Sequence, residues 1–407
     1  MMSDGLGSEQ ERMLSPASRS KRDLGLIALK SLLTSRALIF LFWVLAVFTF
    51  YFILFKIVMN SCVSQHLASV CEFGGWVASK LPCPEESAHV KTLFWSSVVG
   101  SWALSFVRQN GQRNFSIVDR LWPLFPVVLV AQWLYDDRAY FSCAAAADDL
   151  QVRTAQHKAI AAMVLVAIWG ARLCFNSIRR GDYAVGAEDY RWAVTRAAIE
   201  RRLPACSCLR WAVWETFNIV FISLFQLALL YLISVPLRLA IQYTATVADG
   251  TVNAAADGWS FTEIALVVLL IVLLEVEAIA DQQMYKFQQR KKQGALTKHE
   301  AEAGFVHSGL WKYSRHPNVA CEQAFWVVMC VFCATATGTD LGSPENIWLL
   351  SGPALLILLM WASVQLTESI SRSKYPLYQA YQLQTSRLIP WKPWSASQVI
   401  NQAHSKL

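Results

Sequence analysis

The stretch Gly309-Leu-Trp-Lys-Tyr-Ser-Arg-His-Pro-Asn-Val-Ala-Cys-Glu322 places basic, acidic and amide side chains directly before an apolar run that begins at Gln323. Pro317 favours extended geometry at the residue before it and suits the first turn of a helix. A helix that begins there directs its free N–H groups and the positive end of its dipole toward Arg315. That arrangement is typical of a phosphate or carboxylate site, although a basic loop beside a membrane span would explain the same residues.

The composition around this stretch indicates a membrane protein. The 407 residues are 55% hydrophobic and 16% charged, with a mean hydropathy of +0.34, whereas soluble domains carry about 25% charged residues. The net charge of +7 comes from basic residues scattered between apolar segments, which is typical of a membrane-topology signal. We therefore expect the bilayer as a partner and no nucleic acid. The ten cysteines form no Cys-x-x-Cys pair with matching histidines, so we expect no metal site.

Eight apolar segments reach or approach the length of a membrane span. They cover residues 37–55, 92–107, 121–135, 159–175, 216–237, 264–279, 323–339 and 347–366. We therefore predict an all-α, polytopic membrane domain of about eight transmembrane helices over residues 37–393. A disordered, basic cytosolic tail (1–36) precedes it, and a short polar tail (394–407) follows it.

The distribution of charge predicts the orientation of these segments. If the N-terminus is cytosolic and eight spans alternate, the inside loops are 108–120, 176–215 and 280–322, together with the C-terminal tail. With residues 1–36, these parts hold about thirty of the 36 lysines and arginines. The outside loops carry mainly acidic residues. This distribution obeys the positive-inside rule and predicts that both termini are cytosolic.

The fourth segment presents an arginine face. Arg172, Asn176 and Arg179 are spaced i, i+4, i+7, which places them on one side of a helix at its cytosolic end. Ionisable groups inside a span are costly and are functional candidates by default. An ordinary basic anchor at the membrane surface is the alternative, but an anchor would not need Arg172 and Asn176 inside the span.

The sixth segment presents carboxylates at the same helical spacing as the arginine face of the fourth segment. Glu277, Asp281 and Tyr285 recur every four residues and share one helical face. We expect the two carboxylates to find partners on the arginine face of the fourth segment. A purely structural cluster of ion pairs would have the same sequence, so both interpretations stay open.

Two further segments carry weaker signals. Tyr378 and Tyr381 lie at helical spacing shortly after Lys374, which is slightly more than anchoring at a membrane interface requires. Asp119 precedes the third apolar segment and is a candidate functional carboxylate. Capping of a helix by Ser116 or Asp119 would explain the same residues.

These separated segments present cations, carboxylates, amides and phenols at one membrane face. The pattern favours a bulky anionic cofactor that enters from the cytosol, with apolar helices that leave room for a lipid-soluble substrate. The chain has no Gly-x-Gly-x-x-Gly after a strand and no Walker lysine, so a nucleotide site would have to be built from helices and loops.

The same motifs resemble a known superfamily. Trp311 to Glu322, with its Ser-Arg-His-Pro-Asn core, is similar to the C-terminal signature of the steroid 5-alpha-reductases and sterol reductases. Arg172 to Trp192, and Lys374-Tyr375-Pro to Ser386-Arg387-Leu-Ile-Pro390, resemble the functionally unassigned branch of that superfamily, a domain of unknown function. Isoprenylcysteine carboxyl methyltransferases share the Arg-His-Pro element, so this element alone does not distinguish reduction from methylation.

The resemblance implies an integral membrane reductase, of the endoplasmic-reticulum type, that takes hydride from NADPH to a carbon–carbon double bond of a steroid or other lipid. By this resemblance, Asn318 and Glu322 match residues that contact the nicotinamide half of the cofactor. Asp281 matches an aspartate near the cofactor's sugar. Arg172 and Arg179 fall where arginines of the superfamily bind the cofactor's phosphates. The full set of expected cofactor-binding residues is Arg172, Asn176, Arg179, Asp281, Arg290, Trp311, Tyr313, Arg315, His316, Asn318, Glu322, Lys374, Tyr378 and Tyr381.

The catalytic acid departs from the superfamily pattern. In characterised steroid reductases, an acidic residue and a tyrosine polarise the substrate carbonyl. The aromatic residue one turn before Arg172 is Trp169, which donates a hydrogen bond but does not readily yield a proton. Asp119 and Glu277 are the candidates for the catalytic carboxyl group.

Two other functions remain as alternatives to NADPH-dependent reduction. One is a membrane methyltransferase that uses S-adenosylmethionine, because Glu322 and Arg315 would serve either cofactor. The other is a non-catalytic lipid-binding or transport protein. Transport is disfavoured because the ionisable groups gather at one face, whereas transporters bind substrates near the middle of the membrane.

Overall fold

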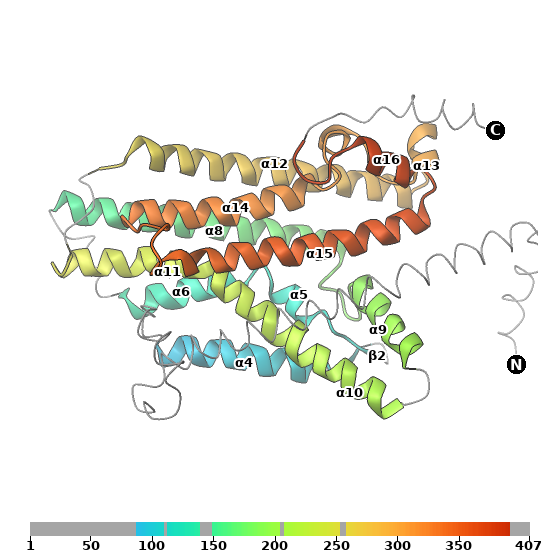
Figure 1. Ribbon diagram of the computed structural model, residues 1–407, viewed down its shortest axis with the longest axis horizontal. Coiled ribbons are helices and arrows are strands. Elements are labelled where there is room, and N and C mark those ends of the chain that lie inside the picture. Colours follow the sequence, from blue (N-terminus) through green and yellow to red (C-terminus); the bar gives the residue numbers. More distant parts are fainter. Residues whose placement is uncertain (1–86, 110–111, 139–148, 204–206, 253–257, 391–407) are drawn as a thin grey trace, which may run out of the picture.

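The computed structural model describes residues 87–109, 112–138, 149–203, 207–252 and 258–390, and this part of the chain is mostly helical, as predicted (Figure 1). Two short antiparallel strands, β1 (Arg108–Gln109) and β2 (Gln112–Arg113), pair with each other. The expected first span (37–55) and both expected tails lie outside the described residues, so these expectations stay predictions.

The structure contains the following helical elements, given in chain order. They are α4 (Ala88–Leu104), α5 (Ile117–Leu121), α6 (Phe125–Asp136), α8 (Leu150–Arg180), α9 (Tyr190–Arg202), α10 (Ser207–Phe217), η1 (Asn218–Phe225, a π-helix), α11 (Gln226–Ala248), α12 (Phe261–Lys292), α13 (Lys298–Ala303), η2 (Gly309–Lys312), α14 (Pro317–Ala336), η3 (Ile347–Leu350), α15 (Ser351–Lys374) and α16 (Tyr378–Gln384).

Four helical segments among the described residues are long and apolar enough to cross a membrane. They are Leu150–Arg180, Ser207–Ala248, Pro317–Ala336 and Ile347–Lys374. The structure therefore supports an integral membrane protein with four candidate spans. α12 is 32 residues long but carries three glutamates, and α4 and α6 have only 17 and 12 residues. A total of eight spans stays a prediction.

Local sequence signals explain where the long helices begin and end. The side chain of Asp149 caps α8 by accepting a hydrogen bond from the Gln151 N–H at 2.8 Å, and Gly181, at a φ of 89°, ends it in the left-handed conformation that glycine tolerates. α12 begins with a capping box formed by Ser260 and Glu263. α14 begins at Pro317, as its sequence predicts.

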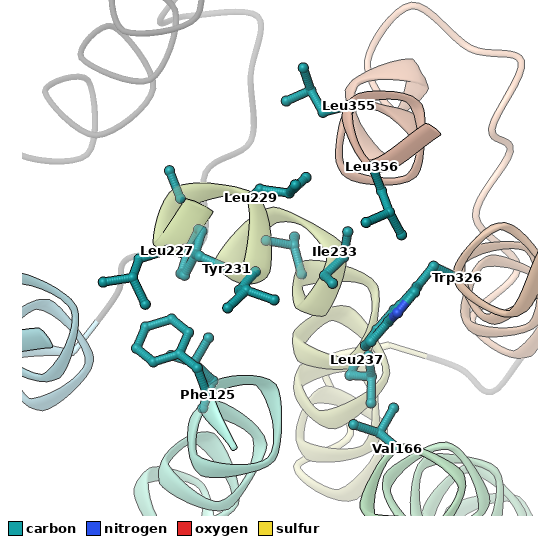
Figure 2. Packing of buried hydrophobic residues seen from close by; sticks show 14 of the residues in the cluster. Phe125, Val166, Leu227, Leu229, Tyr231, Ile233, Leu237, Trp326, Leu355 and Leu356 are labelled. Atoms are coloured by element: carbon teal, nitrogen blue, oxygen red, sulfur yellow. The ribbon is translucent and has the colours of Figure 1, made fainter. Parts of the chain in front are cut away.

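The apolar core surrounds α11, which packs against α6, α8, α14 and α15. Figure 2 shows Phe125, Val166, Ile233, Trp326 and Leu356 converging from these five helices. The core positions the last turns of α8 and the first turns of α14, which carry several of the candidate residues.

Two glycines allow helices to approach closely in this core. A Cβ atom at Gly170 of α8 would lie 2.6 Å from the Pro123 carbonyl oxygen, and one at Gly352 of α15 would lie 2.6 Å from the backbone of Leu232. Because backbone atoms cannot move aside easily, both positions require glycine.

α12 runs parallel to α8 along the edge of the bundle. In the first third of each helix Lys158 Nζ lies 2.6 Å from Glu263 Oε1, and farther along Arg172 Nη2 lies 2.8 Å from Glu277 Oε1. Both helices therefore end at the same side of the molecule. α9, α13 and α16 gather at that end, on the right of Figure 1.

Candidate functional site

Arg172 of α8 forms ion pairs with three carboxylates from two other helices. Its Nη1 atom lies 2.7 Å from Asp281 Oδ2, and its Nη2 atom lies 2.8 Å from Glu277 Oε1 and 3.4 Å from Glu322 Oε2. The Arg172 side chain is 10% exposed, and the three carboxylate side chains are 4–11% exposed. The predicted pairing between the arginine face and the carboxylate face therefore forms, and it is largely shielded from solvent.

Two asparagines complete the surroundings of Asp281. Asn176 Nδ2 donates to Asp281 Oδ2 at 2.6 Å, and Asn318 Nδ2 donates to Asp281 Oδ1 at 3.2 Å. Together with Arg172, three donors hold this carboxylate. We call the six residues Arg172, Asn176, Glu277, Asp281, Asn318 and Glu322 the Arg172 cluster.

Two tryptophans hold Glu322. Trp169 Nε1 donates to Glu322 Oε2 at 2.8 Å, and Trp326 Nε1 donates to Glu322 Oε1 at 3.2 Å. The two indole rings meet edge to face, with their centroids 4.9 Å apart. Both oxygens of Glu322 are thus bonded, and the carboxylate has a fixed orientation at the first turns of α14.

Glu277 has fewer partners than the other two carboxylates. Its Oε1 atom pairs with Arg172, but its Oε2 atom is buried and has no hydrogen-bond partner among the residues that the structure describes. The Nε atom of Arg172 is also buried and also has no hydrogen-bond partner among the described residues. Within the part of the chain that the structure describes, the Arg172 cluster therefore contains one unsatisfied acceptor atom and one unsatisfied donor atom.

The formal charge of the Arg172 cluster is negative. It contains one guanidinium group and three carboxyl groups, so its charge is −2 when all of them are ionised. Uncompensated charge is costly to hold away from water. This part of the site therefore suits a cationic group or a proton and does not suit a phosphate.

Arg179 lies two turns farther along α8 and has different neighbours. It donates to the side-chain oxygen of Gln282, and its guanidinium lies 4.4 Å from the ring centroid of Tyr285. Among the described residues it contacts no carboxylate. Of the two arginines expected to bind phosphate, Arg179 therefore keeps its positive charge uncompensated.

Arg315 and His316 belong to a second cluster, which is organised by Glu368 of α15. Arg315 Nε lies 2.6 Å from Glu368 Oε1, and His316 Nε2 lies 3.1 Å from the same oxygen. Arg315 Nη1 also donates to the carbonyl oxygens of Gln382, at 3.0 Å, and Thr385. These internal bonds occupy the guanidinium that the sequence predicts to contact the cofactor.

The backbone after α16 pairs with the backbone before α14. The Arg315 N–H donates to the Ser386 carbonyl at 3.0 Å, and the His316 N–H donates to the Arg387 carbonyl at 3.1 Å. We call residues 314–316, Glu368, Gln382 and residues 385–387 the C-terminal clamp. It fixes the Arg-His-Pro motif against the end of the described chain.

The predicted aromatic residues support the segment before the clamp. Trp311 Nε1 donates to the Ala280 carbonyl at 3.1 Å, and the Tyr381 hydroxyl donates to the Trp311 carbonyl. Tyr378 and Tyr381 pack against Phe305. Burial raises the pKa of both tyrosines, so these phenols stay neutral and act here as packing and hydrogen-bonding groups.

Three more predicted residues belong to neither the Arg172 cluster nor the C-terminal clamp. Tyr313 and Lys374 are exposed. Arg290 forms a two-pronged pair with Glu300, at 2.8 and 2.5 Å, and its hydrogen bond is the largest influence that lowers the pKa of that carboxyl group. The contacts of Arg290 join α12 to α13.

Asp119 also lies in a different network. It accepts a hydrogen bond from Trp192 Nε1 at 2.8 Å. Removal from water raises the pKa of Asp119, and the charge of Arg191 partly opposes this shift. Among the described residues, no contact joins Asp119 to the Arg172 cluster. Of the two predicted catalytic carboxyl groups, Glu277 alone is placed in that cluster.

The sequence analysis missed two features of this end of the molecule. Trp326 lies four residues after Glu322 in α14, and this spacing was a signal that the two side chains share a face. A cavity of about 280 Å³ lies between α9 and α10, away from the predicted residues. It is lined by Arg196, Ile199, Glu200, Arg210, Trp211 and Trp214.

Comparison with known proteins places the chain in a family. Residues 105–385 match the family described as "Protein of unknown function (DUF1295)", and this range contains every predicted site residue. The chain is 30% identical over 288 residues to "Uncharacterized protein C594.04c" of Schizosaccharomyces pombe, which covers 68% of this chain and 73% of the relative. No solved structure matches. The chain therefore belongs to the DUF1295 family.

Proposed function

We propose that this protein is a membrane-embedded reductase that uses NADPH to reduce a carbon–carbon double bond in a lipid-soluble substrate. The motif resemblance to the steroid 5-alpha-reductase and sterol-reductase superfamily supports this proposal. We place the protein in the endoplasmic reticulum membrane, with the Arg172 cluster toward the cytosol.

The residues fit the two halves of NADPH differently. Asn318 and Asn176 carry amide groups at the Arg172 cluster, where the charge is negative, and amides are suited to orienting the carboxamide of the nicotinamide ring. Arg179, which has no carboxylate partner among the described residues, suits a phosphate because arginine binds phosphates through charge-assisted hydrogen bonds. When bound, NADPH supplies a hydride.

The negative charge of the Arg172 cluster is the observation that carries the proposal. Enzymes accelerate a reaction through interactions that strengthen in the transition state. A dihydronicotinamide ring gains positive charge as it gives up hydride, so the surplus carboxylates of the cluster favour that change.

The same charge disfavours the methyltransferase alternative. The sulfonium of S-adenosylmethionine is positive before transfer and neutral afterwards. Carboxylates beside it would stabilise the starting state more than the transition state and would slow the transfer. This argument concerns the rates of hydride and methyl transfer and not the affinities for the two cofactors. Cofactor binding and group transfer must therefore both be measured.

Cofactor binding and hydride transfer test the proposal together. We expect NADPH to raise the melting temperature of the purified, detergent-solubilised protein, because a ligand at one hundred times its Kd stabilises by about 2.7 kcal/mol. We expect S-adenosylmethionine to have no such effect. NADPH deuterated at C4 should transfer deuterium to a membrane lipid, detected by mass spectrometry.

Other outcomes would favour the alternatives. Stabilisation by S-adenosylmethionine alone, with transfer of a labelled methyl group, would establish a methyltransferase. If neither cofactor binds, the non-catalytic lipid-binding or transport alternative is favoured and the reductase proposal fails.

A further inference from the structure

We infer that Glu277 holds the proton that the proposed reduction requires and delivers it to the substrate. This inference rests on the proposed function and adds the source of the second hydrogen atom. It assigns proton donation to Glu277 and not to Asp281 or Glu322, the other two carboxyl groups of the Arg172 cluster.

The hydrogen bonds of the cluster decide which carboxyl group is protonated. Asp281 accepts from Arg172, Asn176 and Asn318. Such donors favour an ionised carboxylate, and a carboxyl group that lacks them is the one that binds a proton when charges crowd together.

Glu322 is held in the same way and Glu277 is not. Glu322 accepts from Trp169 and Trp326 and lies 3.4 Å from Arg172 Nη2. Glu277 shares Arg172 with the other two carboxyl groups, and its Oε2 atom has no partner within the described ranges. The geometry therefore leaves Glu277 as the member of the cluster that binds the proton.

The neighbours of Glu277 come from three helices. Arg172 of α8 is the positive neighbour. Asp281 on its own helix and Glu322 of α14 are the negative ones, and Glu322 also shares a side-chain hydrogen bond with Glu277. The thiol of Cys321 on α14 is a further titratable neighbour. With Glu277 neutral, the cluster carries a formal charge of −1, so half of its uncompensated charge is removed.

The proposed step balances atoms and electrons. One carbon of the double bond accepts the hydride that NADPH supplies, and the π electron pair moves to the neighbouring carbon. That carbon forms a C–H bond with the proton of Glu277, whose O–H bond breaks and leaves a carboxylate. The substrate is reduced by two electrons, NADPH is oxidised to NADP⁺, and a proton from water later restores Glu277.

Charge conservation couples the two transfers. When Glu277 loses its proton, the cluster changes from −1 to −2. Loss of hydride from bound NADPH would give the nicotinamide ring a charge of +1, so the total local charge around Glu277 would stay the same. Glu277 therefore loses its proton readily only when a positively charged ring lies beside it.

This coupling predicts a difference between the two forms of the cofactor in the absence of substrate. We expect NADP⁺ binding to release about one more proton than NADPH binding, because the positive ring favours the Glu277 carboxylate. The proton count is measured by titration calorimetry at pH 7 in two buffers with different ionisation enthalpies. The affinity for NADP⁺, relative to that for NADPH, should rise up to about tenfold per pH unit while Glu277 is protonated.

Two variants of α12 assign the proton. Glu277→Gln should abolish the difference between NADP⁺ and NADPH. Glu275→Gln is the matched control, because Glu275 lies two residues earlier on the same helix and is exposed. It should keep the difference.

The outcomes separate this inference from the proposed function. Equal proton release with NADP⁺ and NADPH would overturn the role of Glu277 while leaving the reductase proposal standing, and so would a difference that persists in Glu277→Gln. If neither form binds, both proposals fail. The comparison of the two forms in the wild-type protein needs no variant, so it tests the inference even if E277Q folds poorly.

Discussion

At the residue scale, the neighbours of each arginine separate residues that look alike in sequence. Arg172, Arg179 and Arg315 all match positions expected to meet the cofactor. In the structure Arg172 faces three carboxylates, Arg315 is held by Glu368, and Arg179 meets an amide and an aromatic ring. Arg179 is therefore the one of the three that we expect to bind a phosphate.

Substitution of Arg179 tests this assignment. Arg179→Gln should weaken NADPH binding by about 1.5–3 kcal/mol, the typical contribution of a hydrogen bond to a charged group, which corresponds to roughly tenfold to a hundredfold in Kd. The adjacent Arg180 is the matched control, because it is exposed and pairs with Asp182. Arg180→Gln should change the Kd less than twofold. Equal effects of the two substitutions would remove Arg179 from the site.

The residue scale also shows what the sequence can predict. The four-residue period of Glu277 and Asp281 predicts that they face the arginines of α8, and the structure confirms this pairing for Arg172 but not for Arg179, which meets Gln282 and Tyr285. Periodicity does not reveal how many carboxylates share one guanidinium, because Glu322 comes from a distant segment. The same limit applies to Asp119, whose partner Trp192 lies 73 residues away.

At the scale of elements, the C-terminal clamp explains why the Arg-His-Pro motif and the chain end after α16 belong together. Residues 386 and 387 accept backbone hydrogen bonds from Arg315 and His316. His316 has a φ of −142° and a ψ of 63°, which lies outside the extended region, so the usual preference of the residue before proline does not explain this pairing. The sequence predicts the helix that starts at Pro317 but contains no signal for the pairing, which joins segments about seventy residues apart.

Glu368 is the residue whose loss should release the clamp. Its carboxylate is 3% exposed and pairs with Arg315, which is 7% exposed. Glu368→Gln leaves the buried guanidinium of Arg315 without a counter-charge, and breaking a buried pair in this way costs about 3–5 kcal/mol. We therefore expect a lower melting temperature without cofactor, and unchanged NADPH affinity after correction for the folded fraction.

Glu302→Gln serves as the control for this variant, because Glu302 is exposed and lies in α13, at the same end of the molecule. It should leave the melting temperature unchanged. A Glu368→Gln protein of normal stability that binds NADPH poorly would show instead that the clamp belongs to the cofactor site.

At the scale of the whole molecule, parallel packing of α8 and α12 gives the protein two different ends. Lys158 and Glu263 meet in the first third of each helix. Arg179, at the end of α8, meets Gln282, which lies in the last third of α12. Since the basic loops expected inside the cell follow the last turns, both helices should end toward the cytosol. Two of the three glutamates of α12, Glu263 and Glu277, have cationic partners on α8 and are compatible with a span, whereas Glu275 is exposed.

The position of α12 across the membrane is the test of this arrangement. At 1.5 Å per residue, its 32 residues extend about 48 Å, more than the roughly 30 Å of the hydrocarbon core. Reporter fusions at Gly250 and Glu300, which flank α12, should therefore report opposite sides, with Glu300 cytosolic. A fusion at Asp340, between α14 and α15, should agree with Gly250, because one span separates it from Glu300. If Gly250 and Glu300 report the same side, α12 lies along the membrane surface and the predicted set of eight spans is wrong.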